Sequence, residues 1–367
     1  MMRVLHLVSE KTWRGGEQQV AYLVAELQRH QVESFVACPR GSAFEAHCRQ
    51  HHIPYLALSF SKLRLLGDAL KLKAYIDRHR IQLVHMHSSL AHTLGVLAHT
   101  LGARADLVLS RRVEFSIGRN PFSTFKYNYS GIKRIICVSE SVRRQLAASI
   151  QDGSKCVTIY SGIDLKKATL EASRKEDFLR STYHIPQDLK LIGNVSALDR
   201  HKDYFTFLET AKILKESGVK AKYFAIGSGP LEAEIKEYAE RLGLRDDVVF
   251  TGFLKNAKAV LAELEVFLFT TLKEGIGSTV LDAFASKVPV VSTSAGGVPE
   301  IVRHGHTGLL APLRDATALA AHVQQVLRDA QLREHLVEQA YQLVLTFTQE
   351  RTAIKTLAVY QEIIELR

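Results

Sequence analysis

The sequence predicts an α/β protein with two domains, each built on a doubly wound parallel sheet. Short apolar runs alternate with amphipathic helical segments along most of the 367 residues, a pattern typical of helices wound around parallel strands. The length suits two domains of ordinary size. The alternation stops near residue 160 and starts again near residue 191, which indicates where one sheet ends and the next begins.

Seven buried strands are expected in the first domain, residues 1–170, because each is a short, mostly apolar run beside turn residues. They are residues 4–8, 34–37, 54–58, 82–86, 107–110, 134–138 and 157–160. Helical periodicity is clearest in residues 17–29, 62–80 and 140–150. A charged stretch that ends at residue 175 is expected to be a linker.

The second domain, residues 171–345, repeats the alternation. Its expected strands are residues 191–195, 221–226, 247–251, 266–269 and 288–292. Residues beyond about 315 have helical periodicity to the end of the chain. A final helix is expected over residues 350–366, within a third segment of residues 346–367.

The composition is that of a globular protein, with 46% apolar and 23% charged residues. No run approaches the roughly 18 apolar residues of a membrane-spanning helix. The first residues are expected to form a buried strand and not a signal peptide. The four cysteines lack metal-binding spacing, which favours free thiols in a reducing cytoplasm.

Positive charge is concentrated in the first half of the chain. Residues 1–170 hold 24 Lys and Arg against 12 Asp and Glu, whereas the remainder holds 24 against 26. This imbalance indicates an anionic partner, such as membrane headgroups or a phosphorylated acceptor, or else a solvated basic surface. Nucleic acid is the least favoured partner, because no nucleic-acid-binding module accompanies the charge.

One segment, residues 274–292, carries the clearest chemical signal. Glu274 precedes a glycine loop, a helix is expected to begin near Ser278, and Asp282 lies in its first turns. The free amides at a helix start suit a phosphate, and the two flanking acids can accept hydrogen bonds from hydroxyls. A nucleotide-sugar has this chemistry. The alternative is an ordinary connection between a strand and a helix.

The segment resembles the acidic motif of glycosyltransferase family 4, whose members are retaining enzymes of GT-B fold. The resemblance continues in order along most of the chain. The further matching segments are residues 15–16, 194–202, 227–231, 249–253, 296–300 and 308–310. It implies two Rossmann-like domains with a cleft between them and a last helix that crosses back to the first domain. It also implies a UDP- or GDP-linked sugar as co-substrate, with no metal and no other cofactor.

By the same resemblance, Glu274 contacts the donor sugar and Lys202 neutralises the departing diphosphate, and both are candidate catalytic residues. Gly277, Ser278 and Thr279 would offer amides to the phosphates. The remaining candidate donor-binding residues are Gly15, Gly16, Ser196, Arg200, Gly229, Gly252 and Phe253.

Two positions depart from the family pattern. Ala197 stands where an arginine is usual, so Arg200 or His201 is expected to supply the missing charge. Asp282 stands where the family has a glutamate that binds the ribose hydroxyls. Its side chain is one methylene shorter, so nucleotide affinity or base preference is expected to differ.

The candidate acceptor side lies in the first domain. His85 and His87 end an expected strand, so their side chains point the same way. Three interpretations are open: metal binding, acceptor recognition with His87 nearest the cleft, and a hydrogen-bonded core pair. Arg112 takes the place of a family histidine and is also a candidate catalytic residue. Arginine is a poor base but can bind a phosphate or carboxylate of the acceptor, or stabilise the departing diphosphate.

Two surface segments suit a lipid interface. Residues 62–80 form a basic amphipathic pattern, in which Leu63, Leu66, Leu70 and Ile76 are expected to pack inward while basic residues face water. An anionic membrane surface or plain solvent would satisfy the basic face. Residues 119–129 read as a loop with aromatic side chains beside charges, which suits a lipid interface or an acceptor sugar.

The sequence therefore predicts a retaining, metal-independent glycosyltransferase that acts on a cell-envelope glycan or a lipid-linked sugar. It is expected in the cytoplasm, with peripheral attachment to the inner face of the membrane. A nucleotide-sugar epimerase of the same fold is the alternative enzyme. A non-catalytic sugar-binding or nucleotide-sugar-binding protein is the other alternative, and the departures at Ala197 and Asp282 keep it open.

Overall fold

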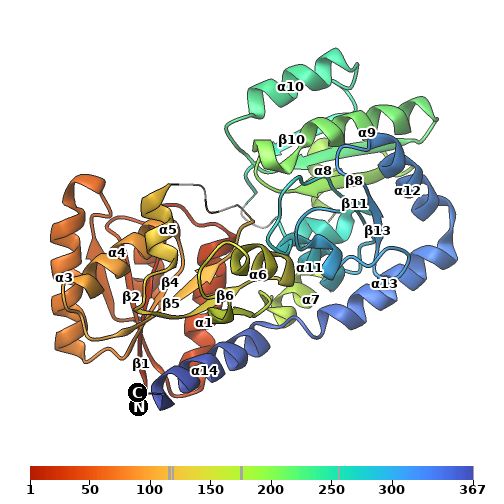
Figure 1. Ribbon diagram of the computed structural model, residues 1–367. Coiled ribbons are helices and arrows are strands. Elements are labelled where there is room, and N and C mark those ends of the chain that lie inside the picture. Colours follow the sequence, from red (N-terminus) through yellow and green to blue (C-terminus); the bar gives the residue numbers. More distant parts are fainter. Residues whose placement is uncertain (115–116, 118–119, 174–176, 255–256, 367) are drawn as a thin grey trace. The chain divides into compact units, whose positions relative to one another are not determined.

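The computed structural model describes the chain except residues 115–116, 118–119, 174–176, 255–256 and 367 (Figure 1). The described chain forms two compact units. One holds residues 1–162 and 349–367, and the other holds residues 163–348. Residues 163–170, which sequence analysis assigns to the first domain, therefore lie in the second unit. The last helix, α14 (Gln349–Glu365), belongs to the first unit.

The first unit is built on a seven-stranded parallel sheet with the order β3-β2-β1-β4-β5-β6-β7. All seven predicted strands are confirmed. They are β1 (Arg3–Leu7), β2 (Glu33–Pro39), β3 (Tyr55–Leu58), β4 (Leu83–Met86), β5 (Asp106–Arg111), β6 (Ile132–Cys137) and β7 (Cys156–Thr158). The helices are α1 (Gly15–Arg29), α2 (Ala43–Gln50), α3 (Leu65–His79), α4 (Ser89–Thr100), α5 (Pro121–Tyr127) and α6 (Glu140–Ala147), together with α14.

The sheet of the first unit has a buried apolar layer on each face, as expected when helices cover both sides of parallel strands. Helix α14 packs beside α1 on one face, where Tyr360 and Ala353 join Val4 and Leu27 in one buried cluster. The four free cysteines are also buried in this unit.

The second unit is built on a six-stranded parallel sheet with the order β10-β9-β8-β11-β12-β13. The strands are β8 (Lys190–Val195), β9 (Ala221–Ile226), β10 (Val248–Gly252), β11 (Val266–Phe269), β12 (Val290–Thr293) and β13 (Leu309–Ala311). The helices are α7 (Leu165–Ser173), α8 (Phe178–Tyr183), α9 (Tyr204–Glu216), α10 (Glu232–Arg241), α11 (Ser278–Ala285), α12 (Ala316–Arg328) and α13 (Ala330–Val344). Sequence analysis does not include β13 among its expected strands, although residues 308–310 belong to the segments that resemble the family.

Two predicted irregular segments are helical. The predicted linker contains α7, whose Ala168 is buried while Lys166 and Lys167 face solvent, so the charges mark one helix face and not an unstructured connection. The predicted loop over residues 119–129 contains α5, which begins after Asn120. The Asn120 side chain caps this helix by accepting a hydrogen bond from the Phe122 amide at 3.0 Å. Residue 119 lies outside the described residues.

The predicted inward face of residues 62–80 is wrong at three of four positions. A 3₁₀ turn, η1 (Lys62–Arg64), precedes α3, and the buried residues of α3 are Asp68, Ala69, Leu72 and Ile76. Leu63, Leu66 and Leu70 are exposed. The Asp68 carboxylate accepts hydrogen bonds from Ser59 Oγ at 2.6 Å and from the Phe60 amide at 2.8 Å. This buried acid sets the rotation of α3, which turns the leucines outward.

In the part of the chain that the structure describes, no helix is long and apolar enough to cross a membrane.

We expect Asp68→Ala to lower the free energy of unfolding by about 1–3 kcal/mol, because the Phe60 amide would be left buried without an acceptor. Urea denaturation followed by circular dichroism measures this change. The matched control is Asp77→Ala on the same helix, which removes the i,i+4 ion pair with Lys73. The control should cost about 0.5 kcal/mol or less. Equal losses in both variants would contradict the role assigned to Asp68.

Candidate functional site

The main candidate site lies in the second unit, where the strand order reverses between β8 and β11. In parallel α/β sheets, ligands bind beyond the carboxyl ends of the strands at this point. The loops that follow the two strands are held together here. Thr270 Oγ1 donates to the Asp203 carbonyl at 3.0 Å, and Thr271 Oγ1 donates to the His201 carbonyl at 3.0 Å. The two loops therefore present one continuous surface.

Lys202 and Glu274 meet on this surface, although 72 positions separate them in the chain. Lys202 Nζ donates to Glu274 Oε2, and their side chains are 16% and 17% exposed. Lys202 Nζ also lies 5.3 Å from the centre of the Phe269 ring. Both side chains are largely shielded from solvent. A ligand could replace this ion pair if a phosphate became the partner of the lysine and a hydroxyl became the partner of the acid. The structure thus brings together two of the four candidate catalytic residues.

Helix α11 begins directly after this loop. Gly277 is its N-cap residue and adopts the left-handed conformation, with φ of 84°, which favours glycine. The helix starts at Ser278, followed by Thr279, and the first amides of a helix have no acceptor within it. These amides and the positive end of the helix dipole suit an anion. The Gly297 amide donates to the Glu274 carbonyl at 3.1 Å, which ties the 296–300 segment to the same loop.

Asp282 also faces a lysine. Its carboxylate is buried, and Oδ1 accepts a hydrogen bond from Lys258 Nζ at 2.8 Å. Lys258 precedes the 3₁₀ turn η4 (Ala259–Glu263), and its side chain is 37% exposed. Sequence reasoning misses Lys258, because no motif marks it and its link to Asp282 spans 24 positions. Both acids of the predicted motif are therefore held by lysines in this structure.

Two glycines of the 227–231 segment have a packing role. A Cβ on Gly229 would lie 2.3 Å from the Leu198 carbonyl oxygen, and one on Gly227 would lie 2.1 Å from that of Ser196. Glycine is thus required for the loops after β8 and β9 to approach each other. The Ser196 hydroxyl is 3.1 Å from both Asn194 Oδ1 and the Tyr204 hydroxyl. Donor contacts by Ser196 and Gly229 stay predictions, beside these structural roles.

Three other predicted donor-binding residues lie at loop positions of the second unit. Gly252 ends β10 with a positive φ of 69°, and Phe253 after it is exposed. Arg200 is exposed and has no ion-pair partner among the described residues, whereas His201 Nδ1 lies 3.2 Å from Asp199 Oδ1. The replacement of the arginine absent at Ala197 by Arg200 or His201 stays a prediction.

The remaining predicted residues, Gly15, Gly16, His87 and Arg112, belong to the first unit. Its strand order reverses between β1 and β4, and α1 begins at Gly15 after β1. A Cβ on Gly16 would meet no atom within 4 Å, so the space beside this helix start is open. Glu17 Oε2 accepts a hydrogen bond from the Arg14 amide at 3.2 Å and caps the helix.

His85 and His87 point the same way, as predicted, and a third histidine joins them. His6 pairs with His85 in the register of β1 and β4, and its Nδ1 lies 3.1 Å from His87 Nε2. His85 Nδ1 contacts the Tyr360 hydroxyl at 2.5 Å, and its Nε2 contacts Ser110 Oγ at 2.8 Å. Sequence reasoning misses His6, because only the strand pairing places it beside the other two.

The three histidines are neutral at physiological pH. Burial lowers the pKa of His6 to about 3 and holds the pKa of His85 and His87 well below the usual value, with a smaller effect from the Arg112 charge on the latter two. One ligand atom from each lies within 4.8 Å of the others, an arrangement that could hold zinc. Both ring nitrogens of His85 are already hydrogen-bonded, so these contacts support a hydrogen-bonded core pair extended by His6.

Arg112 lies beside this cluster and is half-buried. Its Nη1 is 3.5 Å from Ser161 Oγ, and its Nε has no protein partner. Burial lowers the pKa of Arg112 to about 10, against the opposing effect of Glu17, so the guanidinium is charged at neutral pH. His87 Nδ1 is likewise buried without a partner. Buried polar atoms without a partner call for an explanation, and a bound polar ligand would satisfy both.

Comparison with known proteins places both units in one class of enzyme. The family model of glycosyltransferase family 4 matches residues 13–167, and the model described as glycosyl transferases group 1 matches residues 175–343. Together the two matches leave only short segments of the chain uncovered.

Two curated relatives are similar to the chain over half or more of its length. The chain is 26% identical over 313 residues to the N-acetyl-alpha-D-glucosaminyl L-malate synthase of Bacillus anthracis, covering 82% of this chain and 79% of that protein. It is 28% identical over 208 residues to the capsular polysaccharide biosynthesis glycosyltransferase CapM of Staphylococcus aureus, covering 54% and 53%. The latter match spans about half the length of that relative.

The fold matches solved glycosyltransferase structures over nearly the whole chain. Anabaena Alr3699/HepE in complex with UDP and glucose superposes with a TM-score of 0.85 at 20% identity, covering 99% of this chain and 100% of that one. A glycosyltransferase from Rickettsia africae gives the same TM-score and identity and covers 99% and 98%. The predicted two-domain GT-B fold is confirmed.

We expect the stability of the protein to fall as the pH falls below about 6.5. At lower pH the unfolded chain binds protons at histidines that stay neutral in the folded protein. Each such histidine lowers the free energy of unfolding by about 1.4 kcal/mol for each pH unit below its unfolded pKa. His6→Asn should reduce the slope of unfolding free energy against pH by about that amount between pH about 4 and about 6. Urea denaturation across this range measures it. An unchanged slope in His6→Asn would contradict the assignment.

Proposed function

Because the chain belongs to the group 1 and family 4 glycosyltransferases, we propose that it transfers a sugar from a UDP- or GDP-linked donor, with retention of configuration, to a cell-envelope glycan or a lipid-linked acceptor. The observation that carries the proposal is the Lys202–Glu274 ion pair beside the start of α11. A cation for a diphosphate, an acid for a sugar and free helix amides for phosphates occur together there.

The donor would bind by exchanging partners within this pair. Its diphosphate would meet the first amides of α11 and draw Lys202 away from Glu274. Glu274 would then accept hydrogen bonds from the donor sugar and hold its anomeric carbon in place. Asp282 would accept hydrogen bonds from the ribose hydroxyls while it keeps Lys258 as a partner, because an ionised carboxylate can accept several hydrogen bonds at once.

The transfer step breaks the bond between the anomeric carbon and the diphosphate oxygen, which leaves with the electron pair. Lys202 and the α11 amides stabilise the negative charge that develops on that oxygen. The acceptor hydroxyl attacks the anomeric carbon from the same face, and its proton passes to the departing phosphate. The contribution of the protein is therefore to position the reactants and neutralise charge, and no metal is part of the proposal.

The acceptor would bind in the first unit at His87 and Arg112. Arg112 is charged and has a free Nε, so it suits an acceptor that carries a carboxylate or phosphate. Neutral His87 can accept or donate a hydrogen bond through its free Nδ1. Gly15 and Gly16 are proposed to approach the donor diphosphate with their backbone. The malate acceptor in the name of one relative and the capsular role of another support an anionic or envelope acceptor.

The proposed location is the cytoplasm, at the inner face of a membrane that carries anionic lipids. The basic first half of the chain supports this location. The ion-paired Lys202 and Glu274 favour catalysis over the alternative of binding without turnover, because the two groups meet where the donor bond would break.

We expect Glu274→Ala and Lys202→Ala each to lower kcat/KM for sugar transfer about a hundredfold to a thousandfold, because each removes a group that acts on the departing diphosphate or the donor sugar. A coupled assay for released UDP or GDP, run with and without EDTA, measures the loss and tests metal independence. The exposed pair Lys212 and Glu216 on α9 supplies matched control variants with unchanged activity. Full activity in Glu274→Ala would refute the role proposed for this residue.

We expect Asp282→Asn to weaken binding of the nucleotide diphosphate about tenfold, because a charged acceptor for the ribose hydroxyls becomes a neutral one. Isothermal titration calorimetry with UDP and GDP measures the dissociation constant. Asp188→Asn, at an exposed position outside the site, is the control. An unchanged dissociation constant in Asp282→Asn would show that Asp282 serves only as the partner of Lys258.

A further inference from the structure

The outer face of the η1–α3 segment carries three exposed leucines. Leu63, Leu66 and Leu70 are 98%, 58% and 52% exposed. Their spacing of three and four residues places them on one face of the segment. The opposite face of α3 is buried, and its Asp68 is hydrogen-bonded to Ser59 and Phe60 in the segment after β3, so these leucines point away from the core of the unit. A row of large apolar side chains that is held outward in this way marks an interaction surface.

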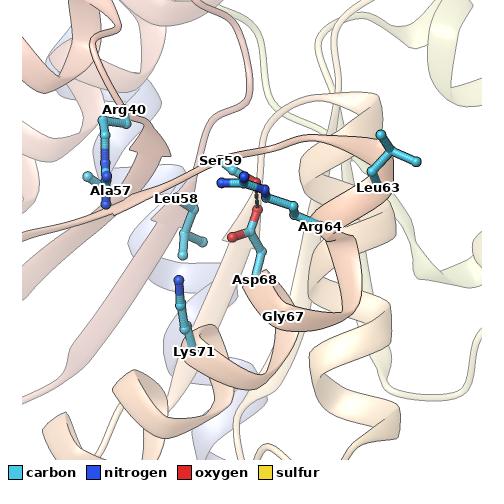
Figure 2. A pocket seen from close by; sticks show the side chains of 9 residues that line it. All are labelled: Arg40, Ala57, Leu58, Ser59, Leu63, Arg64, Gly67, Asp68 and Lys71. Carbon is cyan, nitrogen blue, oxygen red and sulfur yellow. Dashed lines mark hydrogen bonds between the residues drawn. The ribbon is translucent and has the colours of Figure 1, made fainter.

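A cationic pocket of about 510 Å³ adjoins this row. Figure 2 shows Arg40, which follows β2, together with Arg64 and Lys71 around the pocket, and Leu63 at its edge. None of these three cations has an ion-pair partner in the described part of the chain. Asp68 is the one acid in the lining, and its Oδ2 is bonded to Ser59 and Phe60. Three positive charges against one negative charge leave the lining with a net charge of +2.

We propose that this surface, defined by Leu63, Leu66, Leu70, Arg40, Arg64 and Lys71, docks the protein on an anionic phospholipid membrane. The pocket would take a lipid phosphate, and the three leucines would enter the boundary between headgroups and acyl chains. Segments that bind at the surface of an anionic membrane typically combine exposed apolar side chains with cations that have no protein partner. A soluble phosphate would satisfy the cations but would leave the leucines in water.

The inference deepens the membrane location given under the proposed function and rests on that location, but it does not require the transfer reaction. Vesicle binding needs neither donor nor acceptor. A failure of vesicle binding and a failure of catalysis are therefore separate results from separate assays.

The test is flotation of the full-length protein with vesicles of phosphatidylcholine alone and of phosphatidylcholine mixed with phosphatidylglycerol. We expect binding to the mixed vesicles only. A triple variant, Arg40→Gln, Arg64→Gln and Lys71→Gln, should bind at least tenfold more weakly, because each cation near an anionic surface contributes about a fivefold change in affinity. A second variant, Leu63→Ser with Leu66→Ser and Leu70→Ser, should also lose binding while it keeps the charge.

A matched control removes the same charge from the second unit. Lys190, Lys220 and Arg328 are exposed and have no ion-pair partner among the described residues, so their triple change to Gln should leave vesicle binding close to that of the natural protein. Circular dichroism verifies folding, and Leu63→Ser alone provides a variant at a fully exposed position. The proposal is overturned if the natural protein does not float, if neutral vesicles bind equally well, or if the control loses as much binding as the pocket variant.

Discussion

Parallel pairing of the strands is the constraint on which the candidate site depends. Parallel strands need crossover helices, so all the carboxyl ends of one sheet gather at one edge. Where the strand order reverses between β8 and β11, the two following loops lie side by side without a helix between them. Lys202 and Glu274 follow these two strands, and this topology is what brings them into contact.

The site in the second unit is assembled with its charges already paired. Lys202 forms an ion pair with Glu274, and Lys258 forms an ion pair with Asp282, so both partly buried acids have a cationic partner. Unpaired buried charge is costly, which explains why both acids have lysine partners. In the proposed function, a nucleotide-sugar would offer its diphosphate to Lys202 and its hydroxyls to Glu274 and Asp282. Binding can then exchange one set of satisfied charges for another.

A single buried carboxylate decides the character of the α3 surface. Asp68 is bonded to Ser59 and Phe60, and this contact turns Leu66 and Leu70 toward solvent. A helix rotated to bury those leucines would have to leave the carboxylate without partners or expose Ala69 and Leu72. The exposed row of leucines is therefore a consequence of the rotation of the helix. The row lies beside three cations without ion-pair partners among the described residues, and this combination is the basis of the proposed membrane contact.

The sequence by itself predicted twelve of the thirteen strands in the described part of the chain, the start of α11, and Glu274 and Lys202 as site residues, because these follow from local periodicity and from motif order. The tertiary structure alone decided the partners of those residues. It placed Lys258 beside Asp282 and His6 beside His87, which are contacts between residues far apart in the chain. It also decided which face of α3 packs inward and therefore which leucines are exposed. Such contacts depend on strand register and helix packing, which bring together residues from separate segments, and the pattern within one segment does not name its partner in another.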